Sequence, residues 1–108
     1  MALAEKRCVP CEGGALPLLR EEAEELLLEL KGWKLSGDTK NISKELKFKN
    51  YQEAMDFANK ITPIAESEGH HPDLSVGWGR VGVTLSTHAI GGLSENDFIV
   101  AAKIDGIA

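Results

Sequence analysis

The sequence predicts an α+β domain in which helices cover one face of a four-stranded antiparallel sheet, in the order α-β-β-α-β-β-α. Residues 17–31 and 50–68 carry apolar side chains at helical spacing, and a third helix is expected near the C-terminus. Residues 33–49 and the segment between His71 and His88 each read as two short β segments around a glycine-containing turn. At 108 residues, the chain is expected to form a single domain over residues 1–108.

Residues 1–16, which contain a proline and two glycines, are expected to form an irregular arm. Within the arm, the spacing Cys8-x-x-Cys11 allows three interpretations: incidental thiols, half of a zinc site, or a redox pair. A structural zinc site usually has four Cys or His ligands, and the sequence contains no second pair of this kind. Incidental thiols are therefore the favoured interpretation.

The first helix is expected over residues 17–31. Proline is tolerated in a first helical turn, and four glutamates lie towards the N-terminal half, where the helix dipole favours anions. Gly32 ends this helix as a C-cap would. A strand then begins at Trp33, and its partner is expected over residues 42–49, where several lysines indicate an exposed or edge face.

The second helix is expected over residues 50–68. Asn50 suits the N-cap, and Glu53 three residues later completes a capping-box-like pattern. Pro63 removes one backbone donor, so we expect a kink there. Gly69 closes the helix.

The last helix is expected from Ser94 to about Lys103. Ser94 suits its N-cap, and Asp97 takes the place of the usual glutamate of a capping box. Two glycines break the chain just before it.

All three histidines of the chain, His70, His71 and His88, flank the second predicted hairpin. If its apolar positions pair across the turn, His70 lies opposite Thr87, and His88 returns to within about one residue of the doublet. Strand alternation would put His71 and His88 on the face away from the core. The core face would carry Leu74, Val76, Val81, Val83 and Leu85.

Three neighbouring imidazoles can do proton chemistry near neutral pH, one donating a proton while another accepts one. Glu66, in the last turn of the second helix, can orient one ring. Zinc with an open fourth position is the rival interpretation, although adjacent residues such as His70 and His71 point to opposite faces of an extended chain. The third interpretation is that the histidines are structural or merely exposed and have no catalytic role. The sequence has no phosphate-binding glycine loop and no dinucleotide fingerprint.

Composition narrows the class of protein. The formal charge of −5 argues against nucleic-acid binding. The chain has no apolar run long enough to span a bilayer and no signal-peptide pattern at its N-terminus, so a cytoplasmic location without membrane association is expected.

Three segments together resemble the pterin-4a-carbinolamine dehydratase family, also called dimerisation cofactor of a homeodomain transcription factor. They are Glu66-x3-His70-His71-Pro72, Val81-x-Val83-x-Leu85-x-Thr87-His88 and Gly92-Leu93-Ser94-x-x-Asp97. The N-terminal CxxCxGG-like arm and the pair Gly32-Trp33 also look like bacterial members. The resemblance spans essentially the whole chain.

The resemblance implies an enzyme, a hydro-lyase. Its members dehydrate 4a-hydroxytetrahydrobiopterin, released by aromatic amino acid hydroxylases, to quinonoid dihydropterin, which a reductase recycles. It implies no metal and no organic cofactor, and it implies a homodimer or homotetramer. By the resemblance the catalytic residues are His70, His71 and His88, and the substrate-binding residues are Glu66, Gly69, Pro72, Ser86, Thr87 and Asp97.

Our hypothesis is that His70 and His88 act as acid and base on opposite sides of the 4a carbon, while His71 positions the ring. Two alternatives belong to other classes. One is a regulatory scaffold of the same fold that binds a partner protein without essential turnover. The other is a small zinc protein that uses Cys8, Cys11 and histidines.

Overall fold

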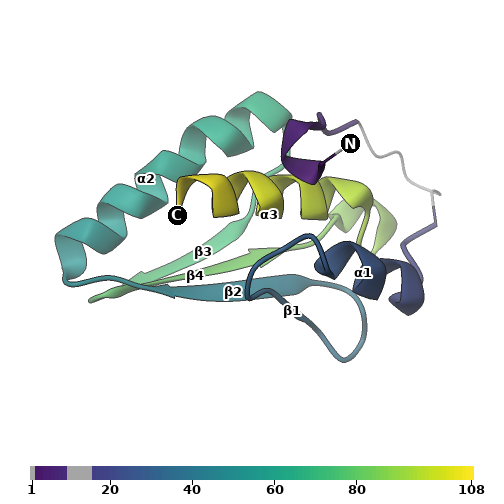
Figure 1. Cartoon of the computed structure of the whole chain (residues 1–108), viewed down its shortest axis with the longest axis horizontal. Helices are drawn as coiled ribbons and strands as arrows, with labels where there is room; N and C mark the ends of the chain where they lie inside the picture. Colours follow the sequence, from purple (N-terminus) through teal and green to yellow (C-terminus); the bar gives the residue numbers. More distant parts are fainter. Residues whose placement is uncertain (1, 10–15) are drawn as a thin grey trace.

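The computed structural model describes residues 2–9 and 16–108, and in this part of the chain four strands form one antiparallel sheet in the order β1-β2-β4-β3. Two hairpins joined by a helix build it, which confirms the predicted α+β class and the order of its elements (Figure 1). The strands are β1 (Lys34–Leu35), β2 (Ile42–Lys47), β3 (Asp73–Gly77) and β4 (Arg80–Leu85). The helices are α1 (Arg20–Leu27), α2 (Tyr51–Glu68) and α3 (Glu95–Ile107), with 3-10 helices η1 (Leu3–Glu5) and η2 (His88–Ile90).

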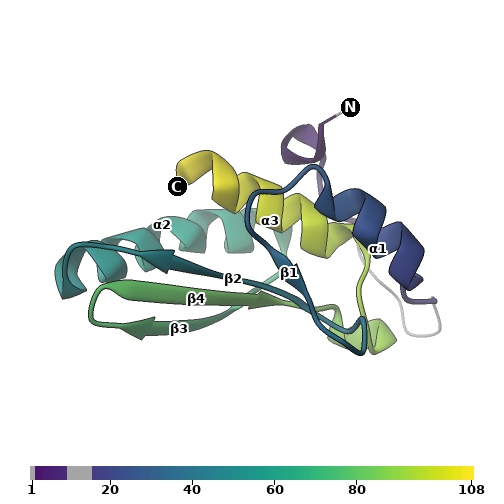
Figure 2. The same cartoon turned by 60° about the horizontal axis from the view of Figure 1, so that its bottom comes forward.

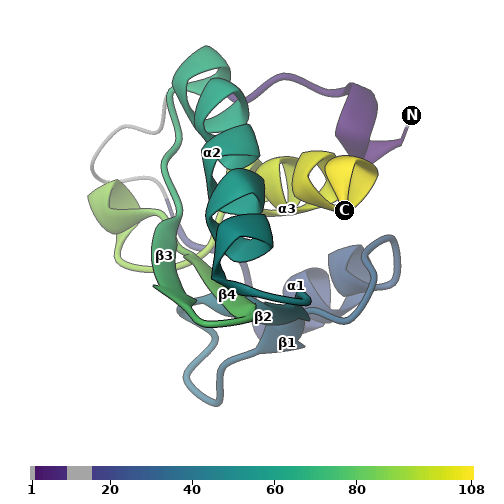
Figure 3. The ribbon, with the colours of Figure 1, turned by 90° about the vertical axis from the view of Figure 1, so that its left-hand side faces the viewer.

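The core lies between the sheet and the helices, which gather on one side of it (Figure 2). Seen from the end of the sheet, α2 and α3 both stand on this side (Figure 3). Alternate residues of the central strands point into the core, and α3 is apolar around most of its circumference because η1 covers its outer side. The fully buried side chains include Ile42, Val81, Val83, Leu85, Phe98, Val100 and Ile104.

The second hairpin has the predicted register. Val76 pairs with Val81 and Leu74 with Val83. Leu74 differs from the expectation for the core face, because its side chain is 40% exposed. The reason is its position: β3 is an edge strand, so Leu74 lies beyond the cover that shields Val83 on the neighbouring central strand.

Helix α2 begins and ends where the sequence predicts. The Asn50 side chain accepts a hydrogen bond from the Glu53 N–H at 2.8 Å, while the Glu53 side chain accepts from the N–H of Lys49. The helix is continuous through Pro63. Gly69 ends it in the left-handed conformation, with a φ of 64°.

Helix α1 is shorter than the expected span of residues 17–31. At its start, the Leu18 N–H donates to the Leu93 carbonyl at 2.8 Å, which holds the chain extended before the helix. At its end, the hydrogen bonds after Leu27 tighten to the 3-10 pattern, and the Lys31 N–H donates to Asp105. Tertiary contacts therefore take over at both ends from the local helical preference.

Three other boundaries also shift. The arm, expected to be irregular, contains η1, and its Leu3 is only 2% exposed within the core. Strand β2 ends at Lys47 rather than at residue 49, and α3 continues to Ile107 rather than ending near Lys103. Among the described residues, no helix is both long enough and apolar enough to cross a membrane.

Candidate active site

The histidine doublet lies directly after α2. Because Gly69 adopts a left-handed conformation, the chain turns sharply there, and the His70 N–H donates to the Ala65 carbonyl at 3.2 Å. This turn sends the two adjacent side chains in different directions. The His70 side chain is 13% exposed and points towards α3, whereas the His71 side chain is 60% exposed. The strand alternation expected for the doublet therefore does not apply, since β3 begins only at Asp73.

Asp97, in the first turn of α3, contacts the His70 side chain from outside the cavity wall. Its Oδ1 lies 2.6 Å from His70 Nε2, and its Oδ2 accepts hydrogen bonds from the Thr87 hydroxyl at 2.8 Å and from the Ser94 N–H at 3.0 Å. Asp97 itself is fully buried. One carboxylate thus joins His70, three residues before β3, to Thr87, two residues after β4, and links the two ends of the hairpin.

His71 has a carboxylate partner as well, but an exposed one. Its Nε2 lies 2.6 Å from Glu66 Oε2, and the Glu66 side chain is 69% exposed. Such a pair in solvent contributes little to stability, because water screens it.

His88 begins the short 3-10 helix η2 in a tight loop after β4. The Thr87 N–H donates to the Gly92 carbonyl at 2.8 Å, and this bridge closes the loop that carries η2. Gly92 has no room for a side chain, since a Cβ atom there would lie 2.7 Å from the Cβ of Pro17. The loop is therefore fixed at its base, and His88, the residue after Thr87, remains exposed.

The three histidines line one cavity of about 490 Å³. This volume lies within the usual range for small-molecule sites, roughly 300–1,000 Å³. The cavity is open on one side, and polar and apolar groups share its walls. Its lining residues are Cys8, Val9, Glu68, Gly69, His70, His71, Ser86, Thr87, His88, Ala89 and Asn96.

The other site residues named from the sequence occupy different places. Gly69, Ser86 and Thr87 lie on the cavity wall together with the histidines. Glu66 and Asp97 are absent from the wall, and each instead contacts a histidine from outside it. Pro72 is also absent from the wall.

Cys8, Glu68 and Asn96 line the cavity but are not among the catalytic or substrate-binding residues predicted from the sequence. The contacts that bring these residues together join positions 60 to 88 residues apart in the sequence, so no local sequence pattern predicts them. The Glu68 side chain accepts from the Cys8 N–H at 2.8 Å, and this bond lowers the pKa of the Glu68 carboxyl. Burial and the nearby Glu68 charge raise the pKa of the Cys8 thiol to about 12, so the thiol is neutral at physiological pH.

The question of a metal depends partly on Cys11, which lies outside the described residues. Within residues 2–9 and 16–108, no three His, Cys, Asp or Glu side chains are grouped so that they could hold a metal ion.

Comparisons with known proteins agree with the residues of the site. Residues 16–107 match the family model described as pterin 4 alpha carbinolamine dehydratase. A relative from Methylococcus capsulatus, named as a candidate pterin-4-alpha-carbinolamine dehydratase, is 48% identical over 107 residues, which cover 99% of this chain and 94% of that protein. A relative of the same name from Nitrosospira multiformis is 53% identical over 103 residues, covering 95% and 89% of the two chains.

A solved structure from Brucella melitensis, titled transcriptional coactivator/pterin dehydratase, superposes with a TM-score of 0.80 at 35% sequence identity. The match covers 85% of this chain and 98% of that one. The family resemblance seen in the sequence is thereby confirmed. The chain belongs to the pterin 4 alpha carbinolamine dehydratase family.

Proposed function

We propose that this protein dehydrates a 4a-hydroxytetrahydropterin, with 4a-hydroxytetrahydrobiopterin as the model substrate, to the quinonoid dihydropterin. The C4a–O bond breaks, the hydroxyl leaves with an added proton as water, and a ring N–H gives up its proton, so no net redox change occurs. The reaction needs one acid and one base, and neither step requires an external oxidant or reductant. The observation that supports it most is the convergence of three imidazoles on one cavity.

His70 is the best-supported acid/base group. An ionised carboxylate can only accept hydrogen bonds, so the short contact with Asp97 places a proton on His70 Nε2. Nδ1 is then the ring nitrogen that can exchange a proton with a ligand. The buried carboxylate also stabilises the imidazolium that forms when Nδ1 takes up a proton.

We assign the second acid/base role to His88 and ring positioning to His71. His88 enters the cavity from the loop after β4, whereas His70 enters from the end of α2, so the two imidazoles come from different elements. His71 and its partner Glu66 are both exposed at the rim. That placement favours contact with the substrate over proton transfer at its centre.

Alanine variants separate these roles. His70→Ala and His88→Ala should each lower kcat by about 10²–10⁴-fold, the usual contribution of a positioned acid or base. His71→Ala should mainly raise KM. Lys47→Ala is the matched surface control, since Lys47 pairs with Arg80 at the opposite end of β4 from His88. A larger loss of kcat in His71→Ala than in His70→Ala, at saturating substrate, would contradict the assignment.

A regulatory scaffold is the second candidate, and the Brucella melitensis title, which includes the words transcriptional coactivator, is the observation that favours it. A pure scaffold does not require the His70–Asp97 contact. If wild-type protein gave no acceleration of dehydration while remaining folded, the scaffold would become the better account.

The oligomeric state and the cellular location are also part of the proposed function. We infer a cytoplasmic homodimer or homotetramer whose product is recycled by a reductase. Strands β1 and β3 lie at the edges of the sheet, and an edge strand offers unpaired backbone groups to another chain. Light scattering coupled to size-exclusion chromatography measures the mass directly, and a monomer at micromolar concentration would contradict the oligomer.

A further inference from the structure

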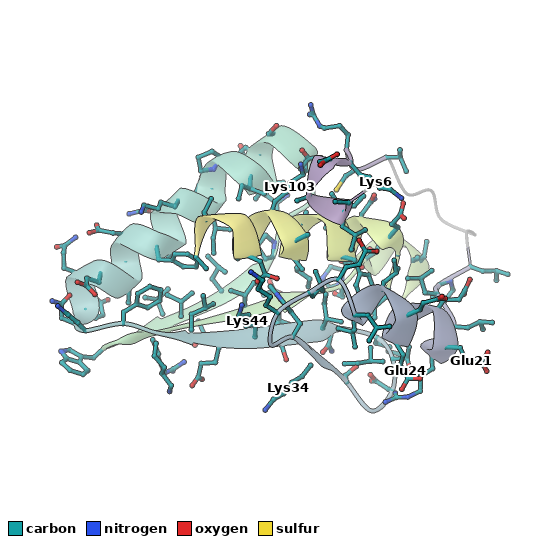
Figure 4. All side chains as sticks on the ribbon, viewed as in Figure 1. Lys6, Glu21, Glu24, Lys34, Lys44 and Lys103 are labelled. Atoms are coloured by element: carbon teal, nitrogen blue, oxygen red, sulfur yellow. The ribbon has the colours of Figure 1, made fainter. Side chains whose placement is uncertain are left out.

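The N-terminal arm, defined here as residues 2–9, reaches the candidate active site. It crosses α3 at η1 and then passes the end of α2, so that Cys8 and Val9 form part of the cavity wall. In the figure with side chains, Lys6 and Lys103 mark where the arm lies against α3 (Figure 4). Among the described lining residues, only these two come from the N-terminal segment, and the others lie at positions 68–71, 86–89 and 96.

The backbone of Val9 is held by a side chain rather than by a strand. Its N–H donates to Asn96 Oδ1 at 3.1 Å, and its carbonyl accepts from Asn96 Nδ2 at 2.6 Å. An asparagine amide offers one acceptor and one donor, so it can satisfy both backbone groups of one residue at once. Asn96 is only 5% exposed, and this shielding from water strengthens the pair of bonds.

A second anchor lies one residue earlier in the arm. The Cys8 N–H donates to Glu68 Oε1 at 2.8 Å, and Arg7 Nε lies 3.0 Å from Glu68 Oε2. The Glu68 side chain is only 4% exposed. Consecutive residues of the arm are thus fixed by two separate side chains, one from the end of α2 and one from the start of α3.

Both anchors are neighbours in sequence of the residues that would carry the chemistry. Asn96 precedes Asp97, and Glu68 lies two positions before His70. The arm is consequently held at a fixed distance from the His70–Asp97 pair. The contacts on the outer side of the arm, such as the Lys6–Glu95 ion pair, involve exposed side chains that do not line the cavity.

The wall that the arm provides is uncharged. Cys8 presents a thiol that stays protonated, because it is partly buried beside a carboxylate, and Val9 is aliphatic. A neutral wall suits the uncharged ring system of a reduced pterin and offers no nucleophile that could attack it.

We propose that Asn96 is a positioning residue that holds Val9, next to the Glu68-anchored Cys8, against the cavity, so that the arm contributes to substrate affinity and not to the chemical step. This inference rests on the proposed function, since it assumes that the cavity binds a pterin. It predicts a division between kinetic parameters. Loosening the arm should weaken binding, while the His70–Asp97 pair continues to transfer protons.

The test uses the full chain with three variants. Asn96→Ala removes both bonds to Val9, and Asn96→Asp keeps the size of the side chain but removes the donor to the Val9 carbonyl. Glu95→Gln is the matched control, because it breaks an arm contact in the same helical turn without touching the cavity. For each protein, KM and kcat are measured with 4a-hydroxytetrahydropterin, Kd with unreactive 7,8-dihydropterin, and amide hydrogen exchange at Cys8 and Val9.

Asn96→Ala and Asn96→Asp should raise KM and Kd by about tenfold, the scale of losing one ordered wall segment, with kcat within about threefold of wild type. Exchange at the Val9 amide should accelerate in both variants, and Glu95→Gln should leave KM within about twofold. In the wild-type protein, bound 7,8-dihydropterin should slow exchange at Cys8 and Val9, a readout that needs no variant.

Two results would overturn the inference. One is faster Val9 exchange in Asn96→Ala with unchanged Kd, which would show that the arm is no wall. The other is a fall in kcat as large as the rise in KM, which would show that Asn96 acts on Asp97 instead. Wild-type turnover tests the proposed function by itself, whereas the variant-to-wild-type ratio of Kd tests the arm. Absence of dihydropterin binding to the wild type would reject the arm's role together with the pterin site.

Discussion

Replacing Asp97 by asparagine isolates the contribution of one buried charge. The carboxylate accepts from two donors at Oδ2, Thr87 and Ser94, and from one at Oδ1, His70. In Asp97→Asn, the amide oxygen should take the position with two donors. The amide nitrogen then faces His70 Nε2, and two donors cannot share that contact.

The Asp97→Asn substitution should change the protonation of the His70 imidazole. His70 should move its proton to Nδ1, the nitrogen that otherwise faces the substrate, and the imidazolium should lose its stabilising partner. We expect kcat to fall by about 10³-fold, which corresponds to about 4 kcal/mol of activation free energy. The free energy of unfolding should fall by about 1–3 kcal/mol, the range for an imperfectly satisfied buried group.

Asp105→Asn is the matched control on the same helix. Asp105 also accepts from several donors, namely Lys44 Nζ at 2.8 Å, Trp33 Nε1 at 3.0 Å and the Lys31 N–H at 3.1 Å, but it is absent from the cavity. Its variant should lose stability by a similar amount while kcat stays within about twofold. The assay is stopped-flow absorbance of dehydration together with urea unfolding. A folded Asp97→Asn with kcat within twofold of wild type would refute the assigned role of this carboxylate.

Three further predictions concern stability and reactivity. The hydrogen bond from the Cys8 N–H lowers the pKa of Glu68 in the folded protein. The ionised carboxylate therefore stabilises the fold at pH values above its unfolded pKa of about 4.3, and this contribution is lost as the pH falls through the lower folded pKa. Urea unfolding should show Glu68→Gln less stable than wild type at pH 7, with the difference in unfolding free energy closing below about pH 4. In a Cys11→Ser background, Cys8 should react slowly with a thiol reagent at pH 8 and much faster when unfolded, because its folded pKa is about 12; equal rates in both states would contradict this burial. Gly92→Ala should lower the free energy of unfolding by about 1–3 kcal/mol, since its Cβ would meet Pro17, and a thermal shift below 1 °C would count against that close contact.

The sequence was most informative where local patterns and physics coincide. Alternation of apolar residues was enough to predict that Val76 pairs with Val81, because a shift of one residue in the register would move every side chain of the strand to the opposite face of the sheet. The cap at Asn50 and the left-handed glycine at Gly69 were likewise predictable, because each meets a local backbone requirement. Correct register and correct helix ends together explain why spacing alone gathered the histidines.

The features that the sequence did not predict depend on contacts between segments that are distant in the sequence. The sequence did not indicate that α1 would begin at Arg20, because the bond from Leu18 to the Leu93 carbonyl decides it. It also did not place Leu3 in the core or Val9 beside Asn96, since an irregular arm has no periodicity that reports its neighbours. The division of the doublet into a largely buried and an exposed ring was not predicted either, because it depends on the turn at Gly69 and on the contact of His70 with Asp97.

The central claim is that this cavity dehydrates a 4a-hydroxytetrahydropterin through His70. The most direct measurement is the rate at which freshly generated substrate loses water, followed by ultraviolet absorbance with and without the protein, beside His70→Ala. The account predicts a large acceleration over the spontaneous reaction that is mostly lost in the variant. No acceleration by folded wild-type protein would contradict it, and full activity in folded His70→Ala would contradict the role of this histidine.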